Sequence, residues 1–133
     1  RERPPQKCLE LFMIVLDPGV ESVDRAIDLR CDAMIGSGWL DEVEKLVTDG
    51  SDARAKAMRS LGYRQLVSHV CGEASLSEAL GAIKAATRQY ARRQRTYFRH
   101  QFADLGPERV MYLEDGTSCP VERVRAFIEG RTP

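Results

Sequence analysis

The chain has 133 residues, of which 43% are hydrophobic, and its 20 basic and 20 acidic side chains give a formal net charge of zero. A chain of this length can bury a hydrophobic core and corresponds to one domain or to a part of one. No apolar run approaches the roughly 20 residues of a transmembrane helix, and the polar start "RERPPQKC" is unlike a signal peptide, so we expect no membrane partner and no cleaved leader.

Neither the cysteines nor the histidines have the spacing of a metal site. Cys8, Cys31, Cys71 and Cys119 are separated by 23, 40 and 48 residues, so no CxxC pair is formed. The two histidines of the chain are not part of a ligand motif. We therefore predict free thiols in a reducing compartment and no bound metal.

The neutral total hides an uneven distribution of charge. Residues 1–54 hold seven basic and twelve acidic side chains, whereas residues 55–100 hold nine basic and only two acidic ones. Residues 101–133 hold four basic and six acidic side chains. A local concentration of positive charge attracts phosphate even in a protein that is neutral overall.

The first predicted element is a strand over about residues 8–16. The run "KCLELFMIVLD" is apolar without a helical stripe, follows two prolines and precedes "DPG". Such a short continuous apolar run is typical of a buried strand in a parallel sheet.

Two amphipathic helices are predicted next. Apolar side chains recur three or four positions apart in "VESVDRAIDLRCDAMIGSG", which then ends at two glycines. That inner stripe consists of Val20, Val23, Ile27, Cys31 and Met34. The second helix, "WLDEVEKLVTDG", turns Leu40, Val43 and Val47 inward, and residues 51–58 are expected to add one or two helical turns.

A long helix is predicted after the turn at Gly62. A new helix begins near Tyr63, and Ser75 with Glu78 forms the capping-box signature "SLSE", from which one helix runs to about Asp104. The predicted helical cluster thus covers about residues 20–104. The inner stripe of the long helix is Leu76, Ala79, Leu80, Ile83, Thr87, Tyr90, Ala91, Gln94 and Phe98.

A second strand and a final helix complete the prediction. "ERVMYLED" favours a strand over about residues 109–114 because of its β-branched and aromatic side chains. A last helix is expected over about residues 120–129, with Pro120 at its first position and Gly130 after its end. The predicted fold class is mainly α with two short strands.

The long helix carries the strongest charge signal, in "TRQYARRQRTYFRH". Arg88, Arg92, Arg95 and Arg99 are spaced 4, 3 and 4 apart and share one face, which we call the arginine ladder. Like charges at these spacings repel by a few tenths of a kcal/mol per pair, yet no acid occurs between Glu78 and Asp104.

Two interpretations of the arginine ladder stay open. The ladder is a solvated face that pairs with acids of the first segment, or it follows the phosphates of a nucleic acid. The composition favours the second interpretation. Neighbouring rings at Tyr90, Tyr97 and His100 would stack on unpaired bases, which favours single-stranded or loop RNA over a duplex.

Four motifs in order now resemble one family. "IDLRCDAMIGSGWLDEV", "RSLGYRQL", "GEASLSEAL" and "TRQYARRQRTYFR" are similar to consecutive signatures of the tRNA dimethylallyltransferase family, also called tRNA isopentenyltransferases. The resemblance covers roughly residues 9–115. The family usually has tryptophan where this chain has Tyr97.

The resemblance implies an activity, a fold and partners. Members transfer a dimethylallyl group from dimethylallyl pyrophosphate to N6 of the adenosine next to the anticodon, which is flipped out of the loop. The partner would be the tRNA anticodon stem-loop. The family fold is P-loop kinase-like, with Mg²⁺ bridging the pyrophosphate. A cytoplasmic monomer is expected, or an organellar one if the source is eukaryotic.

The family's Gly-rich phosphate loop, "G-x-T-x-x-G-K-[ST]", and the catalytic acid that follows it are absent from this sequence. We therefore expect residues 1–133 to be a single C-terminal portion of a P-loop kinase-like α/β fold, lacking the P-loop half and inactive alone. No catalytic or metal residue is predicted here, and Mg²⁺ and the pyrophosphate substrate would be held by the other half.

The resemblance transfers binding roles to particular positions. Arg30 matches a pyrophosphate contact, with pairing to Asp28, Asp32 or another local acid as the alternative. A larger set matches the two tRNA-contacting signatures or lies on the arginine ladder beside them. That set is Arg59, Gly62, Tyr63, Arg64, Arg88, Arg92, Arg93, Gln94, Thr96, Tyr97 and Arg99. Gly62 also suits any tight turn, and Gln94 equally fits the core stripe.

Other functions stay open on the sequence alone. The chain could be a stand-alone RNA-binding helical module, or a protein-interaction domain whose arginine ladder meets an acidic partner. An adenylate-directed isopentenyltransferase is a further alternative, but a free nucleotide needs no long basic surface. The sequence leaves open whether a zinc finger follows.

Overall fold

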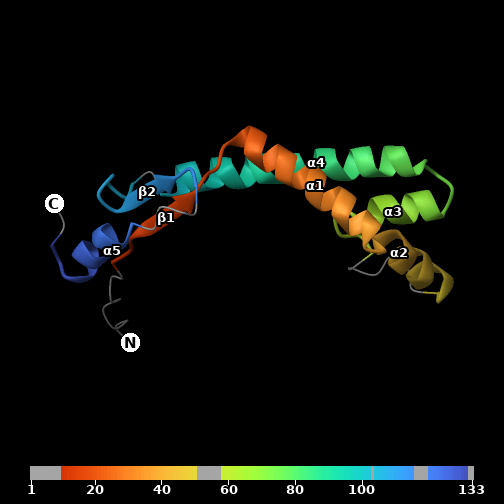
Figure 1. The fold of residues 1–133 in the computed structure, drawn as a ribbon, viewed down its shortest axis with the longest axis horizontal. Coiled ribbons are helices and arrows are strands. Elements are labelled where there is room, and N and C mark those ends of the chain that lie inside the picture. The colour runs from red at the N-terminus through yellow and green to blue at the C-terminus, as the bar shows by residue number, and fades with distance from the viewer. Residues whose placement is uncertain (1–9, 51–57, 103, 116–119, 132–133) are drawn as a thin grey trace, which may run out of the picture. The chain divides into compact units, whose positions relative to one another are not determined.

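The computed structural model describes residues 10–50, 58–102, 104–115 and 120–131. Seven elements follow one another in the chain: β1 (Met13–Leu16), α1 (Val20–Gly36), α2 (Trp39–Thr48), α3 (Tyr63–Val70), α4 (Leu76–Gln101), β2 (Val110–Leu113) and α5 (Val121–Ile128) (Figure 1). The predicted class, mainly α with two short strands, is confirmed. The helical turns expected within residues 51–57 lie outside the described residues.

The chain divides into two compact units. The helical unit is Gly19–Gln94, and the strand unit joins residues up to Pro18 to Arg95–Pro133. Helix α4 contributes its first nineteen residues, Leu76–Gln94, to the helical unit and its last turns to the strand unit.

The core of the helical unit joins one or two side chains from each of its four helices. Leu66 of α3 and Val43 of α2 are fully buried, and Trp39, Cys31 and Ile83 pack with them. The inward positions predicted for α2 are confirmed, because Leu40 and Val47 flank this cluster. Burial of an aliphatic side chain stabilises a fold by about 1.5–3 kcal/mol, so these few residues hold the four helices together.

Gly62 allows α3 to start directly against the Trp39 ring. Its φ of +98° is in the region that favours glycine, and a Cβ at this position would collide with the Trp39 indole. Its backbone N–H donates to Gln65 Oε1 at 2.9 Å, which caps the helix. The Tyr63 ring meets the Trp39 ring edge-on, with 5.8 Å between centroids.

The capping box predicted at the start of α4 is confirmed. The Ser75 backbone N–H donates to Glu78 Oε2 at 2.8 Å, and the Glu78 N–H donates back to Ser75 Oγ at 3.2 Å. The Ser75 hydroxyl also donates to the same carboxylate, and this side-chain bond and then the backbone bond lower the pKa of Glu78. Reciprocal bonds of this kind satisfy donors that a helix start otherwise leaves open.

The strand unit contains a two-stranded parallel sheet. Met13 lies opposite Val110 and Leu16 opposite Leu113. The Phe12 ring contacts Phe127 of α5, with 5.4 Å between centroids.

The prediction of a fully buried first strand is wrong for this chain. Ile14 is 40% and Leu16 56% exposed, while Met13 and Val15 on the other face are half-buried. The alternation arises because β2 is the only strand that pairs with β1 within the described residues. Because one face of β1 is covered and the other is open, the exposure of its side chains alternates from one residue to the next.

The inner stripe predicted for α4 is confirmed only in its first half. Ala79 and Ile83 are buried, whereas Tyr90 is 52% exposed and Phe98 37% exposed. Gln94 is also exposed. The helical core ends near Thr87, so the periodic pattern continues beyond the side chains that could cover it.

Substituting Gly62 with alanine should destabilise the helical unit. The new Cβ would strain the backbone and strike Trp39, so we expect the free energy of unfolding to fall by about 2–5 kcal/mol. Gly81 is the matched control, because a Cβ there meets nothing within 4 Å. Gly81→Ala should stabilise by about 0.5–1 kcal/mol. Urea denaturation followed by circular dichroism measures both, and equal effects of the two substitutions would contradict this role of Gly62.

Acid should weaken the start of α4. Because the folded-state pKa of Glu78 is depressed, its stabilising contribution is complete above the ordinary value of 4.5 and is lost as the pH falls through the lower folded value. An NMR titration of the Glu78 carboxyl should give a midpoint below 4.5. Ser75→Ala should return the midpoint toward the ordinary value, and an unchanged midpoint in that variant would refute the assigned cause.

Candidate nucleic-acid interface

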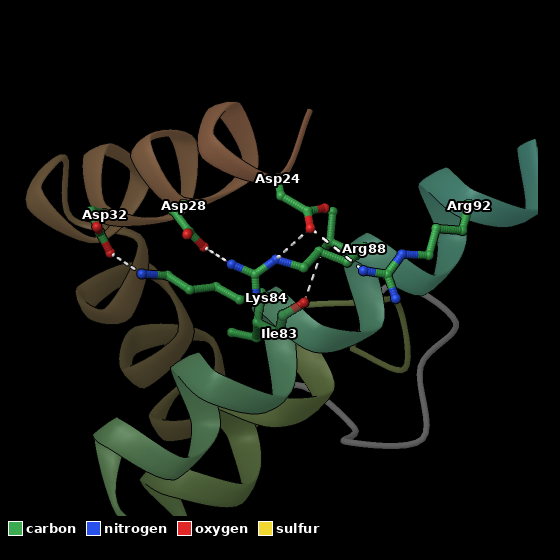
Figure 2. Close-up of polar contacts among 8 residues, drawn as sticks. Asp24, Asp28, Asp32, Ile83, Lys84, Arg88 and Arg92 are labelled. Atoms are coloured by element: carbon green, nitrogen blue, oxygen red, sulfur yellow. Dashed lines mark hydrogen bonds and ion pairs between the residues drawn. The ribbon is translucent and has the colours of Figure 1, made fainter. Parts of the chain in front are cut away.

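Two helices of the helical unit present opposite charges to each other. Asp24, Asp28 and Asp32 recur every fourth residue on one face of α1, and we call them the aspartate ladder. Lys84, Arg88 and Arg92 recur at the same spacing on α4 and point toward it (Figure 2). Because both rows follow the helical repeat, each cation meets an acid without distortion of either helix.

The ion pairs of Asp24, at one end of the rows, are longer than the pairs of Asp28 and Asp32. Lys84 Nζ lies 2.7 Å from Asp32 Oδ1, and Arg88 Nη2 lies 2.5 Å from Asp28 Oδ1. Asp24 Oδ2 is shared, at 3.7 Å from Arg88 Nε and 3.5 Å from Arg92 Nη2. The hydrogen bond to Asp32 is the main cause that raises the pKa of Lys84.

The strand unit repeats this arrangement with a single acid. Asp17, whose side chain is only 14% exposed, accepts from Arg95 Nε at 2.7 Å and from Arg99 Nη2 at 3.3 Å. A carboxylate offers about four lone pairs, so it can accept from two guanidinium groups at once.

The arginine ladder therefore contains two kinds of arginine. Arg88 and Arg95 are the inner arginines, with a close carboxylate and side chains that are 30% and 33% exposed. Arg92 and Arg99 are the outer arginines, with longer contacts and side chains that are 63% and 54% exposed. The outer arginines are thus about twice as exposed to solvent as the inner ones.

Arg93 lies beside the arginine ladder and is not part of it. Its guanidinium carbon is 5.9 Å from the centroid of the Tyr90 ring. The side chain is exposed and forms no ion pair with any acid in the described part of the chain.

The "GYRQ" turn has a clear structural role for two of its predicted site residues. Gly62 packs on Trp39, and the Tyr63 hydroxyl donates to Glu42 Oε1 at 2.8 Å, which is the main cause that raises the pKa of Tyr63. Among the described residues the buried Trp39 N–H has no acceptor at hydrogen-bond distance. Its proximity to the Tyr63 hydroxyl is the smallest of the influences on the pKa of Tyr63, and it lowers that pKa. Arg59 and Arg64 are exposed beside this turn and form no ion pair with described acids.

The local acids that could have paired with Arg30 are engaged elsewhere. Asp28 binds Arg88 and Asp32 binds Lys84, and Arg30 is exposed without an ion pair to any described residue. Its guanidinium is thus open to an anion.

The other predicted contacts lie in the exposed second half of α4. Gln94, Thr96 and Tyr97 all face solvent, and the Tyr97 ring meets the Phe98 ring edge-on at 5.5 Å. Thr87, which shares the predicted stripe, donates instead to the Ile83 carbonyl at 2.8 Å.

The sequence-based reasoning did not include the aspartates among the site residues. Asp24, Asp28 and Asp32 repeat every fourth residue, as do Lys84, Arg88 and Arg92. Equal periods of opposite charge on two helices could have signalled their pairing. Asp17 has no such signal, because it follows a strand.

The acidic side chains of the described residues do not form a magnesium site. Within residues 10–50, 58–102, 104–115 and 120–131, no three His, Cys, Asp or Glu side chains gather in a way that could hold a metal ion. Asp24, Asp28 and Asp32 bind Lys84, Arg88 and Arg92 instead, so no residue described here is given a metal-binding role. Cys31 and Cys71 are free, and Cys8 and Cys119 lie outside the described residues. No described helix is both long and apolar enough to cross a membrane.

Comparison with known proteins identifies the family. The sequence model of the IPP transferase family matches residues 1–101. Over 95 residues the chain is 45% identical to a tRNA dimethylallyltransferase of Geobacter metallireducens, and over 98 residues it is 44% identical to one of Syntrophobacter fumaroxidans. These matches cover 71% and 74% of this chain. This chain belongs to the IPP transferase family.

Solved structures agree with this membership. The fold matches a tRNA isopentenylpyrophosphate transferase of Staphylococcus epidermidis with a TM-score of 0.68 and 29% identity over 91% of this chain. A transferase of the same kind from Bacillus halodurans matches with a TM-score of 0.68 and 26% identity over 92% of this chain. The chain spans about 30% of the length of the curated relatives and 38–39% of these two structures.

Removing an inner arginine should cost stability, whereas removing Arg93 should not. Arg88→Ala breaks the pairs to Asp24 and Asp28, and partly exposed pairs contribute up to about 1 kcal/mol. We expect the free energy of unfolding to fall by about 1 kcal/mol, and Arg93→Ala to change it by less than about 0.5 kcal/mol. Urea denaturation of the unsubstituted chain, Arg88→Ala and Arg93→Ala measures the three free energies of unfolding. Equal stabilities would show that the ion pairs between α1 and α4 are energetically neutral.

Proposed function

We propose that this chain is the tRNA-gripping part of a tRNA-modifying prenyltransferase. The whole enzyme would transfer a dimethylallyl group from its pyrophosphate to N6 of the adenosine next to the anticodon. Membership in the IPP transferase family supports the reaction class. The observation that carries the RNA-binding role is the row of solvent-exposed arginine side chains on α4, at Arg92, Arg93 and Arg99.

These arginines would act by holding phosphates. Guanidinium groups bind phosphate oxygens with paired N–H donors, and such contacts set the orientation of an RNA without reading its sequence. Tyr97 would add a ring on which an unpaired base can stack. Gly62 and Tyr63 would act indirectly, by fixing the turn from which Arg59 and Arg64 project toward the anticodon arm.

Arg30 would bind the pyrophosphate of the prenyl donor. Its exposure and the pairing of its neighbouring aspartates with α4 support this role. The remaining chemistry, including acceptance of the N6 proton and any bound Mg²⁺, would belong to segments of the enzyme other than the residues described above. From membership in the IPP transferase family we also propose that the protein is monomeric and cytoplasmic.

The first measurement is fluorescence anisotropy of the chain with a labelled stem-loop RNA that has an adenosine-rich loop, across a salt series. Affinity that falls steeply with salt and prefers the stem-loop over an RNA duplex of equal length would support the proposal. Absence of binding at low salt would reject a tRNA-gripping role for the isolated chain and favour an acidic protein partner.

Arg92→Ala and Arg93→Ala should each weaken RNA binding without unfolding the chain. Each removes one phosphate-neutralising charge, so the slope of log affinity against log salt should become shallower by about one unit. Arg25→Ala is the matched control, because Arg25 is exposed on α1 outside both ladders. Loss of the folded circular-dichroism signal in either α4 variant would mean that the arginine is structural, and an equal effect of Arg25→Ala would mean that only total charge matters.

A further inference from the structure

We propose that Asp24 is an internal competitor of RNA phosphate for Arg92, so that RNA binds by exchanging its phosphate for this carboxylate. The inference rests on the RNA-binding function proposed above and concerns how that surface is controlled. Three observations carry it: the lengths of the Asp24 contacts, the unequal exposure of the two partners and the two closer pairs farther along the aspartate ladder.

The contacts of Asp24 are long for charged groups. Oδ2 lies 3.5 Å from Arg92 Nη2 and 3.7 Å from Arg88 Nε. Charge-assisted N–H···O bonds are strongest near 2.7–2.9 Å, at roughly twice the strength of neutral ones. A phosphate free to approach Arg92 at the shorter distance would therefore form a better bond than the carboxylate that it replaces.

The exposure of the pair favours entry of a ligand from solvent. The Arg92 side chain is 63% exposed, whereas that of Asp24 is 28% exposed. A phosphate can reach Arg92 from outside without α1 having to move. Once Arg92 turns outward, Asp24 still has Arg88 beside it, so the exchange does not leave a half-buried charge without a counterion.

The neighbouring pairs keep the helices together during such an exchange. Asp28 holds Arg88 at 2.5 Å and Asp32 holds Lys84 at 2.7 Å. Both pairs join the same two helices, and Asp32 and Lys84 directly follow the buried Cys31 and Ile83 in the chain. Asp24 is thus the member of the aspartate ladder with the longest contacts and the one that touches the exposed Arg92.

The expected consequence is that removing a negative charge at Asp24 strengthens RNA binding. Asp24→Asn keeps the shape of the side chain but removes its charge. The need to break an exposed ion pair lowers the affinity of a competing ligand by about two- to fivefold. We therefore expect the affinity for the stem-loop RNA to rise about two- to fivefold in this variant. The salt slope should become steeper, because salt no longer weakens a competing internal pair.

A matched control separates this effect from net charge. Glu44→Gln removes the same charge from an exposed side chain of α2 that forms no side-chain contact with a described cation. We expect it to change affinity by less than about twofold, since distant surface charges are screened. A double-mutant cycle then locates the effect. In an Arg92→Ala background Asp24→Asn should lose its gain, and in an Arg93→Ala background it should keep it.

A measurement on the unsubstituted chain covers the case in which a variant folds poorly. NMR should show the side-chain carboxyl resonance of Asp24 shifting when the stem-loop RNA is added, because Arg92 leaves this carboxylate while Arg88 stays beside it. The resonance of Asp28 should stay in place.

The outcomes separate the two proposals. If the unsubstituted chain binds RNA but Asp24→Asn matches Glu44→Gln or weakens binding, the competitor role is overturned and the proposed function stands. The same conclusion follows if the Asp24 resonance does not move at saturating RNA. If neither the unsubstituted chain nor Asp24→Asn binds RNA at low salt, the proposed function fails and this inference fails with it.

Discussion

The pairing of α4 with aspartates is the constraint on which the rest of this structure depends. A helix with five arginines and no acid after Glu78 repels itself, and each like-charge neighbour weakens it. The carboxylates that offset this repulsion come from elsewhere in the chain: from α1 in the helical unit and from Asp17 in the strand unit. The same contacts that permit a cationic helix also attach it to its neighbours.

The pairing with aspartates divides the arginines of one sequence motif into two classes. The inner arginines, Arg88 and Arg95, bind carboxylates of neighbouring segments closely, and the outer arginines, Arg92 and Arg99, have longer contacts and more exposed side chains. The two interpretations of the arginine ladder are therefore compatible, since close pairing with acids and exposure to solvent occur at different residues. A family member that binds tRNA would need both, because a contact residue must first be positioned.

A second constraint sits in the core, where Gly62 meets Trp39. The family-like "GYRQ" motif resembles a contact motif, yet its glycine is needed so that α3 can start against the indole ring. Tyr63 is tied to the same ring and to Glu42. The flanking Arg59 and Arg64 are exposed, whereas the glycine and the tyrosine are held in the turn by Trp39 and Glu42.

The sequence by itself predicted the order and type of the elements that the structure describes, although the first strand is shorter than expected. Helical periodicity, the "SLSE" cap and the glycine stops are local signals, and local signals decide where a helix begins and ends. It also determined the family, because four motifs occurred in order. What it did not determine was burial: Ile14, Tyr90 and Phe98 fit buried patterns and are exposed. Exposure depends on which other segment covers a side chain, and periodicity carries no information about that segment.

Only the tertiary structure decided what each charged residue does. The spacing of Arg88, Arg92, Arg95 and Arg99 is the same whether the ladder faces acids or solvent. The packing of α1 against α4 brings Asp28 to 2.5 Å from Arg88 but leaves Asp24 at 3.5 Å from Arg92. Coulomb interactions and hydrogen bonds depend steeply on such distances, and the distances are set by the contact of two helices whose paired residues are 52 to 68 positions apart in the chain. The division between structural and available arginines is therefore a property of the fold.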